Sequence, residues 1–244
     1  MSSLGIPNLD GELERTLSRG LDEVESLLSS HIEGDYPLVV ETSRHLVEAG
    51  GKRFRPLITL ISSHFGNGQS RQVVEAAVVC ELTHVATLYH DDVMDEAPLR
   101  RGVESANNRW GNTVAILTGD YLFSKASDLL ADLGPEAVRL QAKTFERLVI
   151  GQIQETQGPK NGTDPIAHYL QVVADKTGSL IATSARFGAM LPALMINMSK
   201  HSRHLARRLE LHSNSLMMSL ISLAIHLNQA RRQELISKRV SQLL

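Results

Sequence analysis

Three side chains in the first half of the chain, His84, Asp91 and Asp95, have the types and the spacing of a metal site. They are seven and four residues apart, so on an α-helix they lie along one stripe. The residues before Asp91 are largely apolar, which predicts a buried helix that carries its carboxylates at its C-terminal end. Because a helix C-terminus already carries partial negative charge, carboxylates clustered there call for a cation. Two carboxylates favour a hard ion such as Mg²⁺, which usually keeps waters and binds substrate phosphates.

The residues that follow strengthen this interpretation. An acidic cluster such as Asp91, Asp92 and Asp95 is often only a solvated helix end, and this is the alternative hypothesis. Arg100 and Arg101 come directly afterwards, however, and the planar fork of a guanidinium matches phosphate oxygens. Metal-binding carboxylates beside phosphate-binding arginines predict a site for a phosphorylated substrate.

A second basic cluster lies upstream. Lys52, Arg53 and Arg55 follow a glycine pair at 50–51, and Pro56 predicts the first turn of a helix over 56–65. Basic side chains beside a glycine turn and a helix N-terminus suit an anionic ligand. A solvated basic loop is the alternative interpretation.

The composition is that of an ordinary globular protein. The 244 residues are 42% hydrophobic and carry a net charge of −2, which argues against a nucleic-acid-binding protein. No apolar run is long enough for a membrane span, and the N-terminus lacks the pattern of a signal peptide, so we expect a cytoplasmic location. Cys80 is the only cysteine and lies in an apolar stretch, where we expect it to be a core residue.

The charge changes abruptly along the chain. Residues 1–191 contain 17 Lys and Arg against 25 Asp and Glu, whereas residues 192–244 contain 8 against 2 and no Gly or Asp. We therefore divide the chain into residues 1–191, which carry the motifs, and a divergent tail over 192–244.

Apolar residues recur at helical spacing almost throughout, and no strand pattern competes. We expect an all-α protein, a bundle of long antiparallel helices around a central cavity in which helix-borne side chains can build a metal site. The predicted helices are 9–31, 37–49, 56–65, 70–91, 107–132, 135–157 and one that begins near residue 167.

Two candidate positions lie further along. Lys176 and Thr177 fall inside the last of these helices, where a lysine is usually a surface residue. Gln152, Gln154 and Glu155 close the helix before it, and their polarity is typical of an exposed helix end.

Five motifs in this order and spacing resemble the trans-isoprenyl diphosphate synthases, in particular long-chain polyprenyl diphosphate synthases. They are GlyGlyLysArgPheArgPro at 50–56, ThrHisValAlaThrLeuTyrHisAspAspValMetAsp at 83–95, ArgArgGly at 100–102, GlyAspTyrLeu at 119–122 and LysThr at 176–177. The resemblance runs from residue 9 to about residue 191. It implies the isoprenoid synthase fold, in which two aspartate-rich motifs face each other across a deep cavity, and a dimer, of two identical or of two different chains.

The resemblance also implies a catalytic role for four residues. Asp91 and Asp95 match the family's Mg²⁺ ligands, Asp92 supports them, and Lys176 lies near the allylic leaving group. Mg²⁺ and basic side chains neutralise the departing diphosphate, so that an allylic cation forms and is attacked by the double bond of isopentenyl diphosphate. Loss of a proton then leaves a product five carbons longer, and an apolar cavity keeps out water that would quench the cation.

Further matches concern the two substrates. Arg100 and Thr177, together with Lys176, match residues that hold the allylic diphosphate. The positions that match the isopentenyl diphosphate site are Lys52, Arg55, His84 and Arg101.

The resemblance also implies that product length is limited by the size of the side chains just before the first aspartate motif. Ala86 and Thr87 lie five and four residues before Asp91, and both are smaller than the aromatic residues that block short-product members. We therefore expect a long product.

The family pattern is interrupted in the tail. A second aspartate motif is expected about 40 residues beyond LysThr, but no Asp follows Asp175. Methionine has the single codon ATG, so the codons of Met217 and Met218 read ATGATG. The last base of the first codon and the first two bases of the second give GAT, which encodes Asp in the shifted frame. With suitable synonymous codons, that frame permits AspAspValIleAsp and a GlyLys loop. We therefore hypothesise that one base is lost between codons 191 and 192 and that residues 192–244 are a frameshifted tail. In this hypothesis the chain is a truncated and impaired synthase that lacks the C-terminal helices of the fold.

Two other functions remain open. The chain could be a non-catalytic helical subunit of a heteromeric prenyl diphosphate synthase. A terpene cyclase is a weaker alternative, because the motif at 50–56 resembles a site for isopentenyl diphosphate, which a cyclase does not use.

Overall fold

A computed structural model describes residue 4 and residues 10–65 and 68–194, with side chains up to residue 191. Predictions about the tail from residue 195 onward, including its frameshift origin, lie outside the described residues. Within them the chain is helical apart from a short hairpin and the connecting loops. The helices are α1 (Gly11–His31), α2 (Pro37–Glu48), α3 (Phe54–Ser63), α4 (Arg71–Met94), α5 (Ala106–Trp110), α6 (Asn112–Leu133), α7 (Pro135–Gln157), α8 (Pro165–Val173), the π-helix η1 (Ala174–Gly178) and α9 (Ser179–Leu194).

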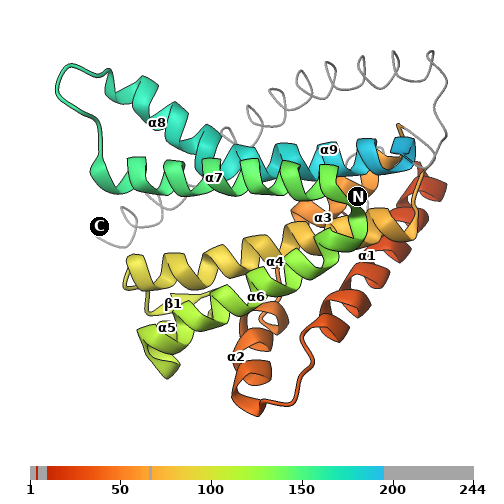
Figure 1. Cartoon of the computed structure of the whole chain (residues 1–244), viewed down its shortest axis with the longest axis horizontal. Helices are drawn as coiled ribbons and strands as arrows, with labels where there is room; N and C mark the ends of the chain where they lie inside the picture. Colours follow the sequence, from red (N-terminus) through yellow and green to blue (C-terminus); the bar gives the residue numbers. More distant parts are fainter. Residues whose placement is uncertain (1–3, 5–9, 66–67, 195–244) are drawn as a thin grey trace, which may run out of the picture.

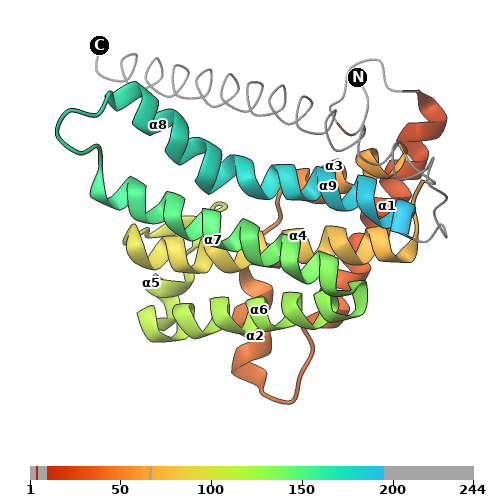
Figure 2. The same ribbon diagram turned by 45° about the horizontal axis from the view of Figure 1, so that its top comes forward.

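Helix α4 forms the centre of the molecule and is packed against α6, α3, α9 and α1. It begins at Ser70, whose hydroxyl accepts a hydrogen bond from the backbone N–H of Val73 and so caps the helix. Apolar side chains surround it on every side, as expected for a buried helix. In Figures 1 and 2, α7 and the long α8–α9 rod lie on one side of α4, while α6 and α2 lie on the other. The central helix is thus held rigidly, and with it the acidic residues at its end.

The all-α fold is confirmed, with four local differences from the predicted elements. The acidic helix continues to Met94 instead of ending at residue 91, so Asp91 and Asp92 are still helical. The helix predicted over 107–132 is divided by Gly111, which has a φ of 85°.

The other two differences are a hairpin and a π-helical turn, whose hydrogen-bond patterns cannot be predicted from the spacing of apolar residues. Strands β1 (Leu99–Arg100) and β2 (Val103–Glu104) pair as an antiparallel hairpin whose turn holds Arg101 and Gly102 at positive φ. A π-helical turn, η1, joins α8 to α9, so Lys176 lies in a widened part of one continuous rod. None of the helices in the described ranges combines the length and hydropathy needed to cross a membrane.

Candidate active site

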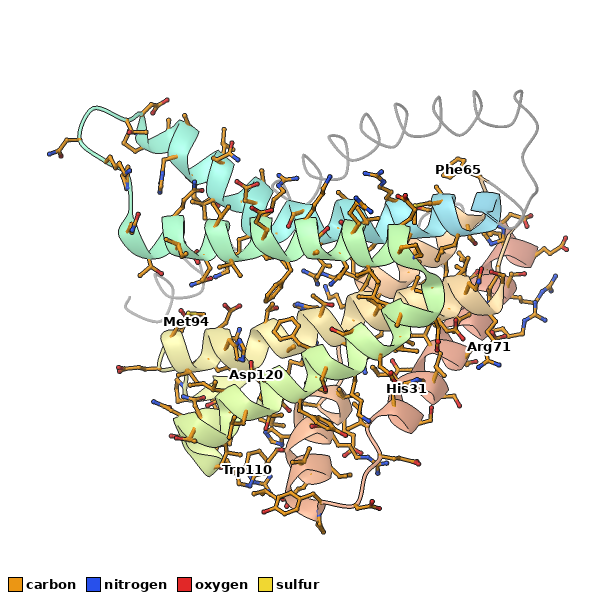
Figure 3. The ribbon with its side chains drawn as sticks, viewed as in Figure 1. His31, Phe65, Arg71, Met94, Trp110 and Asp120 are labelled. Atoms are coloured by element: carbon orange, nitrogen blue, oxygen red, sulfur yellow. The ribbon has the colours of Figure 1, made fainter. Side chains whose placement is uncertain are left out.

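A cavity of about 170 Å³ lies beside the C-terminal half of α4, between that helix and α3, α6, α7 and η1. One end is polar and the rest is apolar, with Phe123, Leu148 and Leu180 among the lining residues. Figure 3 shows Met94, one of the lining residues, at the C-terminal end of α4, and Asp120 on the neighbouring α6. Six residues singled out from the sequence line this one cavity: Arg55, His84, Thr87, Asp91, Lys176 and Thr177.

The acidic end of the cavity is built by the last turn of α4. Asp91 is largely buried and Asp95 is exposed, whereas Asp92 is completely buried. Burial raises the pKa of the Asp91 carboxyl, and the nearby Lys176 opposes that shift. A carboxylate that is costly to ionise in this position gains from a cation placed against it.

Asp92 faces away from the cavity and holds Arg100. One Asp92 oxygen accepts a hydrogen bond at 2.5 Å from Nε of Arg100 and forms an ion pair with Nη2 of the same guanidinium, also at 2.5 Å. Burial raises the pKa of Asp92 and Arg100 opposes the shift. The other carboxylate oxygen, Oδ2, is buried without a hydrogen-bond partner. Asp92 therefore anchors the arginine instead of pointing into the cavity.

The described residues contain no convergent group of three or more His, Cys, Asp or Glu side chains that could hold a metal by themselves. Asp91 and Asp95, one helical turn apart, nevertheless fit an ion that takes one or two protein carboxylates and completes its shell with water and phosphate oxygens. Their oxygen-only donors suit Mg²⁺ or Ca²⁺ better than a transition metal. The residues present thus fit a hard divalent cation that arrives with a diphosphate.

The basic side of the cavity is formed by Arg55 and His84. Arg55 Nε is buried and has no hydrogen-bond partner, and burial lowers the pKa of this guanidinium. Burial first, and then the charges of Arg55 and Arg101, hold the pKa of His84 well below its usual range. His84 is therefore a neutral imidazole at physiological pH, able to donate one hydrogen bond, next to a guanidinium whose Nε has no hydrogen-bond partner among the described residues.

Three other predicted basic residues, Lys52, Arg100 and Arg101, do not line this cavity. Lys52 is exposed on the loop before α3. Arg100 is held by Asp92, and Arg101 donates to the backbone oxygen of Leu46 at 2.5 Å. The arginine pair of the sequence thus points in two different directions, because the intervening hairpin turn reverses the chain.

Lys176 is placed by η1 against both walls of the cavity. Its Nζ lies 2.5 Å from a carboxylate oxygen of Glu155 on α7 and 3.9 Å from one of Asp91 on α4. The close approach of η1 to α7 depends on Gly151, where a Cβ would lie 2.6 Å from the backbone nitrogen of Lys176. Lys176, for which a surface position was the alternative to a role in the site, is three-quarters buried.

Several lining residues were missed by the sequence reasoning. Gln152 was assigned to an exposed helix end, but it lines the cavity and its Oε1 is buried without a partner. Phe145, Leu148, Val149 and Gln152 have the spacing of a single helix face, and that pattern could have identified Gln152. Glu155 carried no comparable signal, because its partner Lys176 is distant in the sequence.

A second cavity of about 420 Å³ lies between α4, α6 and α7. It shares His90, Phe123 and Phe145 with the first cavity, and the two phenylalanine rings meet edge to face with centroids 4.6 Å apart. Thr87 lines the first cavity, whereas Ala86 is buried in the core and lines neither. An aromatic pair therefore separates the polar site from a larger apolar space.

The cavity in this helical bundle thus has carboxylates at one end, basic groups beside them and an apolar interior. The sequence profile of the polyprenyl synthetase family matches residues 36–211. The chain belongs to the polyprenyl synthetase family.

Individual relatives agree with this family. A nonaprenyl diphosphate synthase of Mycobacterium tuberculosis is 48% identical over 187 residues, which are 76% of this chain and 56% of that protein. A heptaprenyl diphosphate synthase component 2 of Geobacillus stearothermophilus is 38% identical over 175 residues, covering 71% of this chain and 55% of the relative. The chain thus spans little more than half the length of these relatives.

Among solved structures, a geranylgeranyl pyrophosphate synthase from Corynebacterium glutamicum superposes with a TM-score of 0.67 at 47% identity. The match covers 76% of this chain and 59% of that one, which was crystallised with calcium and isoprenyl diphosphate.

Proposed function

We propose that this chain carries the isopentenyl diphosphate and metal-binding half of a trans-polyprenyl diphosphate synthase. Such an enzyme joins isopentenyl diphosphate to an allylic diphosphate and extends the product by five carbons. The observation that carries the proposal is the convergence of Arg55, His84, Asp91 and Lys176 on one cavity, although they come from three separate elements.

The basic residues have distinct tasks in this proposal. Arg55 and His84 bind the diphosphate of isopentenyl diphosphate, since both line the cavity and the guanidinium lacks a hydrogen-bond partner at Nε. Lys52 and Arg101 add positive charge at the rim of this site.

The other half of the site receives the allylic diphosphate. Lys176 and Thr177, which line the cavity, hold that group together with Arg100, which matches the family's allylic site in the sequence, and Lys176 stabilises the negative charge that develops as the group departs. Asp91 and Asp95 would hold Mg²⁺, which would add positive charge beside that diphosphate, and Asp92 fixes Arg100. The apolar walls keep water from the allylic cation.

We further propose a long product. The cavity of about 420 Å³ beyond Phe123 and Phe145 gives an elongating chain room, and Thr87, a small residue, lines the first cavity. Ala86 is also small but is buried in the core. The two relatives compared above by sequence are named for nonaprenyl and heptaprenyl products.

The chain by itself is proposed to be impaired. The residues after Asp175 contain no Asp, so the second aspartate motif has no counterpart in this sequence. Residues 1–191 would be the N-terminal part of the synthase domain, and 192–244 a frameshifted tail. Sequencing the coding DNA across codon 191 tests this origin. An uninterrupted alternative frame that encodes AspAspValIleAsp would support it, and stop codons there would refute it.

A non-catalytic subunit is the second candidate function. The missing motif favours it, and the Geobacillus relative is named a component of its synthase. In this case the partner is a second, different chain, whereas the leading proposal expects a homodimer.

Incorporation of radiolabelled isopentenyl diphosphate separates these proposals, with binding measured alongside by calorimetry. We expect the chain to bind isopentenyl diphosphate but to elongate poorly, with residual elongation that requires Mg²⁺ and is abolished by Asp91→Asn. Efficient elongation by the chain alone would refute both the impairment and the subunit role. Absence of binding as well as elongation would refute the proposed function.

A further inference from the structure

Glu81 is a buried carboxylate at the back of the proposed isopentenyl diphosphate site. Its side chain is only 2% exposed, and it lies on α4 one turn before His84. One carboxylate oxygen lies 2.9 Å from Nη1 of Arg53 and 3.6 Å from Nη2 of Arg101. We propose that Glu81 is a positioning residue, which fixes these two arginines and thereby shapes the site for isopentenyl diphosphate; this inference rests on the proposed function.

Hydrogen bonds to the protein hold the guanidinium of Arg53. Besides Glu81, its guanidinium donates to the carboxylate of Glu25 through Nε and Nη2, and to the backbone oxygen of Val47 at 2.9 Å. Its side chain is 9% exposed. Although the sequence groups Arg53 with Lys52 and Arg55, four of its five N–H donors are hydrogen-bonded to the protein. Its function is to tie the loop before α3 to α1, α2 and α4.

Arg101 approaches the same carboxylate from the other side. It lies in the hairpin turn, and both Arg101 and Arg53 have positive φ values, 53° and 45°, in the region that non-glycine residues rarely adopt. Gly51 closes over the pair, since a Cβ there would lie 3.2 Å from each guanidinium. Two strained backbone segments far apart in the sequence are therefore fixed on Glu81.

The charges around Glu81 leave the site with a net positive charge that can attract an anionic ligand. Arg53, Arg55 and Arg101 are crowded together, and burial lowers the pKa of Arg55 and Arg101 while Glu81 opposes the shift in both. Glu81 hydrogen-bonds or pairs with Arg53 and Arg101 but not with Arg55, whose Nε is left without a partner. The cluster therefore keeps a net positive charge directed at the cavity.

Substitution of Glu81 separates positioning from simple electrostatics. Glu81→Gln removes the negative charge at constant shape, so electrostatics alone predicts tighter binding of an anion. Positioning predicts the opposite, because the two arginines lose their common anchor. Calorimetry with isopentenyl diphosphate should show binding weakened about tenfold, a change typical of residues that orient a ligand's direct contacts. Binding of an allylic diphosphate with Mg²⁺ should change less than about twofold.

Two further variants complete the test. Glu81→Asp keeps the charge but shortens its reach, so it should also weaken binding of isopentenyl diphosphate, and it replaces Glu81→Gln if that variant does not fold. Glu75→Gln is the matched control, because Glu75 lies on the same helix but pairs with the exposed Arg71. Unchanged or tighter binding in both Glu81 variants would overturn the proposal.

A second readout does not depend on the proposed function. If the parent chain binds no isopentenyl diphosphate, the proposed function fails, yet the positioning of Arg101 is still decided by phenylglyoxal modification followed by peptide mass spectrometry. Faster modification of Arg101 in Glu81→Gln than in the parent supports an anchoring role for Glu81. Equal rates would refute it.

Discussion

The contact between η1 and α7 at Gly151 provides a sensitive test of how Lys176 is placed. In Gly151→Ala the new Cβ would lie 2.6 Å from the backbone nitrogen of Lys176 and 3.1 Å from the Cβ of Asp175. Ordinary van der Waals contact begins at 3.4 Å, and a backbone atom cannot rotate out of the way. The π-helical turn must therefore move away from α7, and Lys176 must move with it.

Two opposing effects set the magnitude. Overpacking a tight interface by one methyl group costs about 1–3 kcal/mol, whereas Ala in place of Gly inside a helix gains about 1 kcal/mol. We expect a net loss of about 1 kcal/mol in the free energy of unfolding. For a chain of this size, that loss corresponds to a fall in Tm of about 2–4 °C.

The assay combines urea unfolding with binding of an allylic diphosphate in the presence of Mg²⁺. Gly151→Ala should lower both the midpoint of unfolding and the affinity, because Lys176 moves away from Asp91 and Glu155. Gly11→Ala is the matched control, since a Cβ at Gly11 would meet nothing within 4 Å, and it should change stability by less than about 0.5 kcal/mol. A Gly151→Ala variant that is as stable as the parent and binds equally well would refute the close packing.

Three other perturbations have definite expected results. Tyr89→Phe removes the buried hydroxyl that donates to the backbone oxygen of Thr42, and urea unfolding should show a loss of about 1–3 kcal/mol; no loss would refute the bond. Arg100→Ala leaves the buried Asp92 without its partner and should cost about 3 kcal/mol, part of which the double variant with Asp92→Asn should restore; strictly additive losses would argue against the pair. Burial raises the pKa of Cys80 from 9.0 to about 11, so the folded chain keeps a proton that the unfolded chain releases. Stability should therefore fall as the pH rises from about 9 to about 11, and the fall should be smaller in Cys80→Ala when unfolding is compared at pH about 8 and about 10.5.

The sequence predicted well those features that depend on neighbours along one helix. The acidic helix, the helix over 135–157 and the burial of Cys80 all follow from apolar spacing, and the structure confirms them. The end of α4 was placed three residues too early, because a run of acidic residues resembles a solvated loop. The π-helical turn at η1 was missed, since no periodicity distinguishes it from an ordinary helix.

The candidate site was only partly predictable. Arg53 and Arg55 look equivalent in the sequence, yet Arg53 is bound by two carboxylates while Arg55 lines the cavity with its Nε unpartnered. The role of Glu81 was not predicted, because a glutamate in an apolar helix has no partner in the sequence pattern. Its partners are brought to it only when α1, α3 and the hairpin pack around α4.

By itself the sequence determined which side chains share a helix face, because that depends only on the 3.6-residue period and on the local signals that begin and end helices. It therefore fixed the stripe of His84, Asp91 and Asp95 and the all-α class. Only the tertiary structure decided which charges meet, as Lys176 meets Asp91 across the cavity and Glu81 meets Arg53 and Arg101 behind it. The reason is physical: a charged side chain specifies the sign of its partner, but long-range packing selects the partner and excludes the water that would otherwise screen the pair.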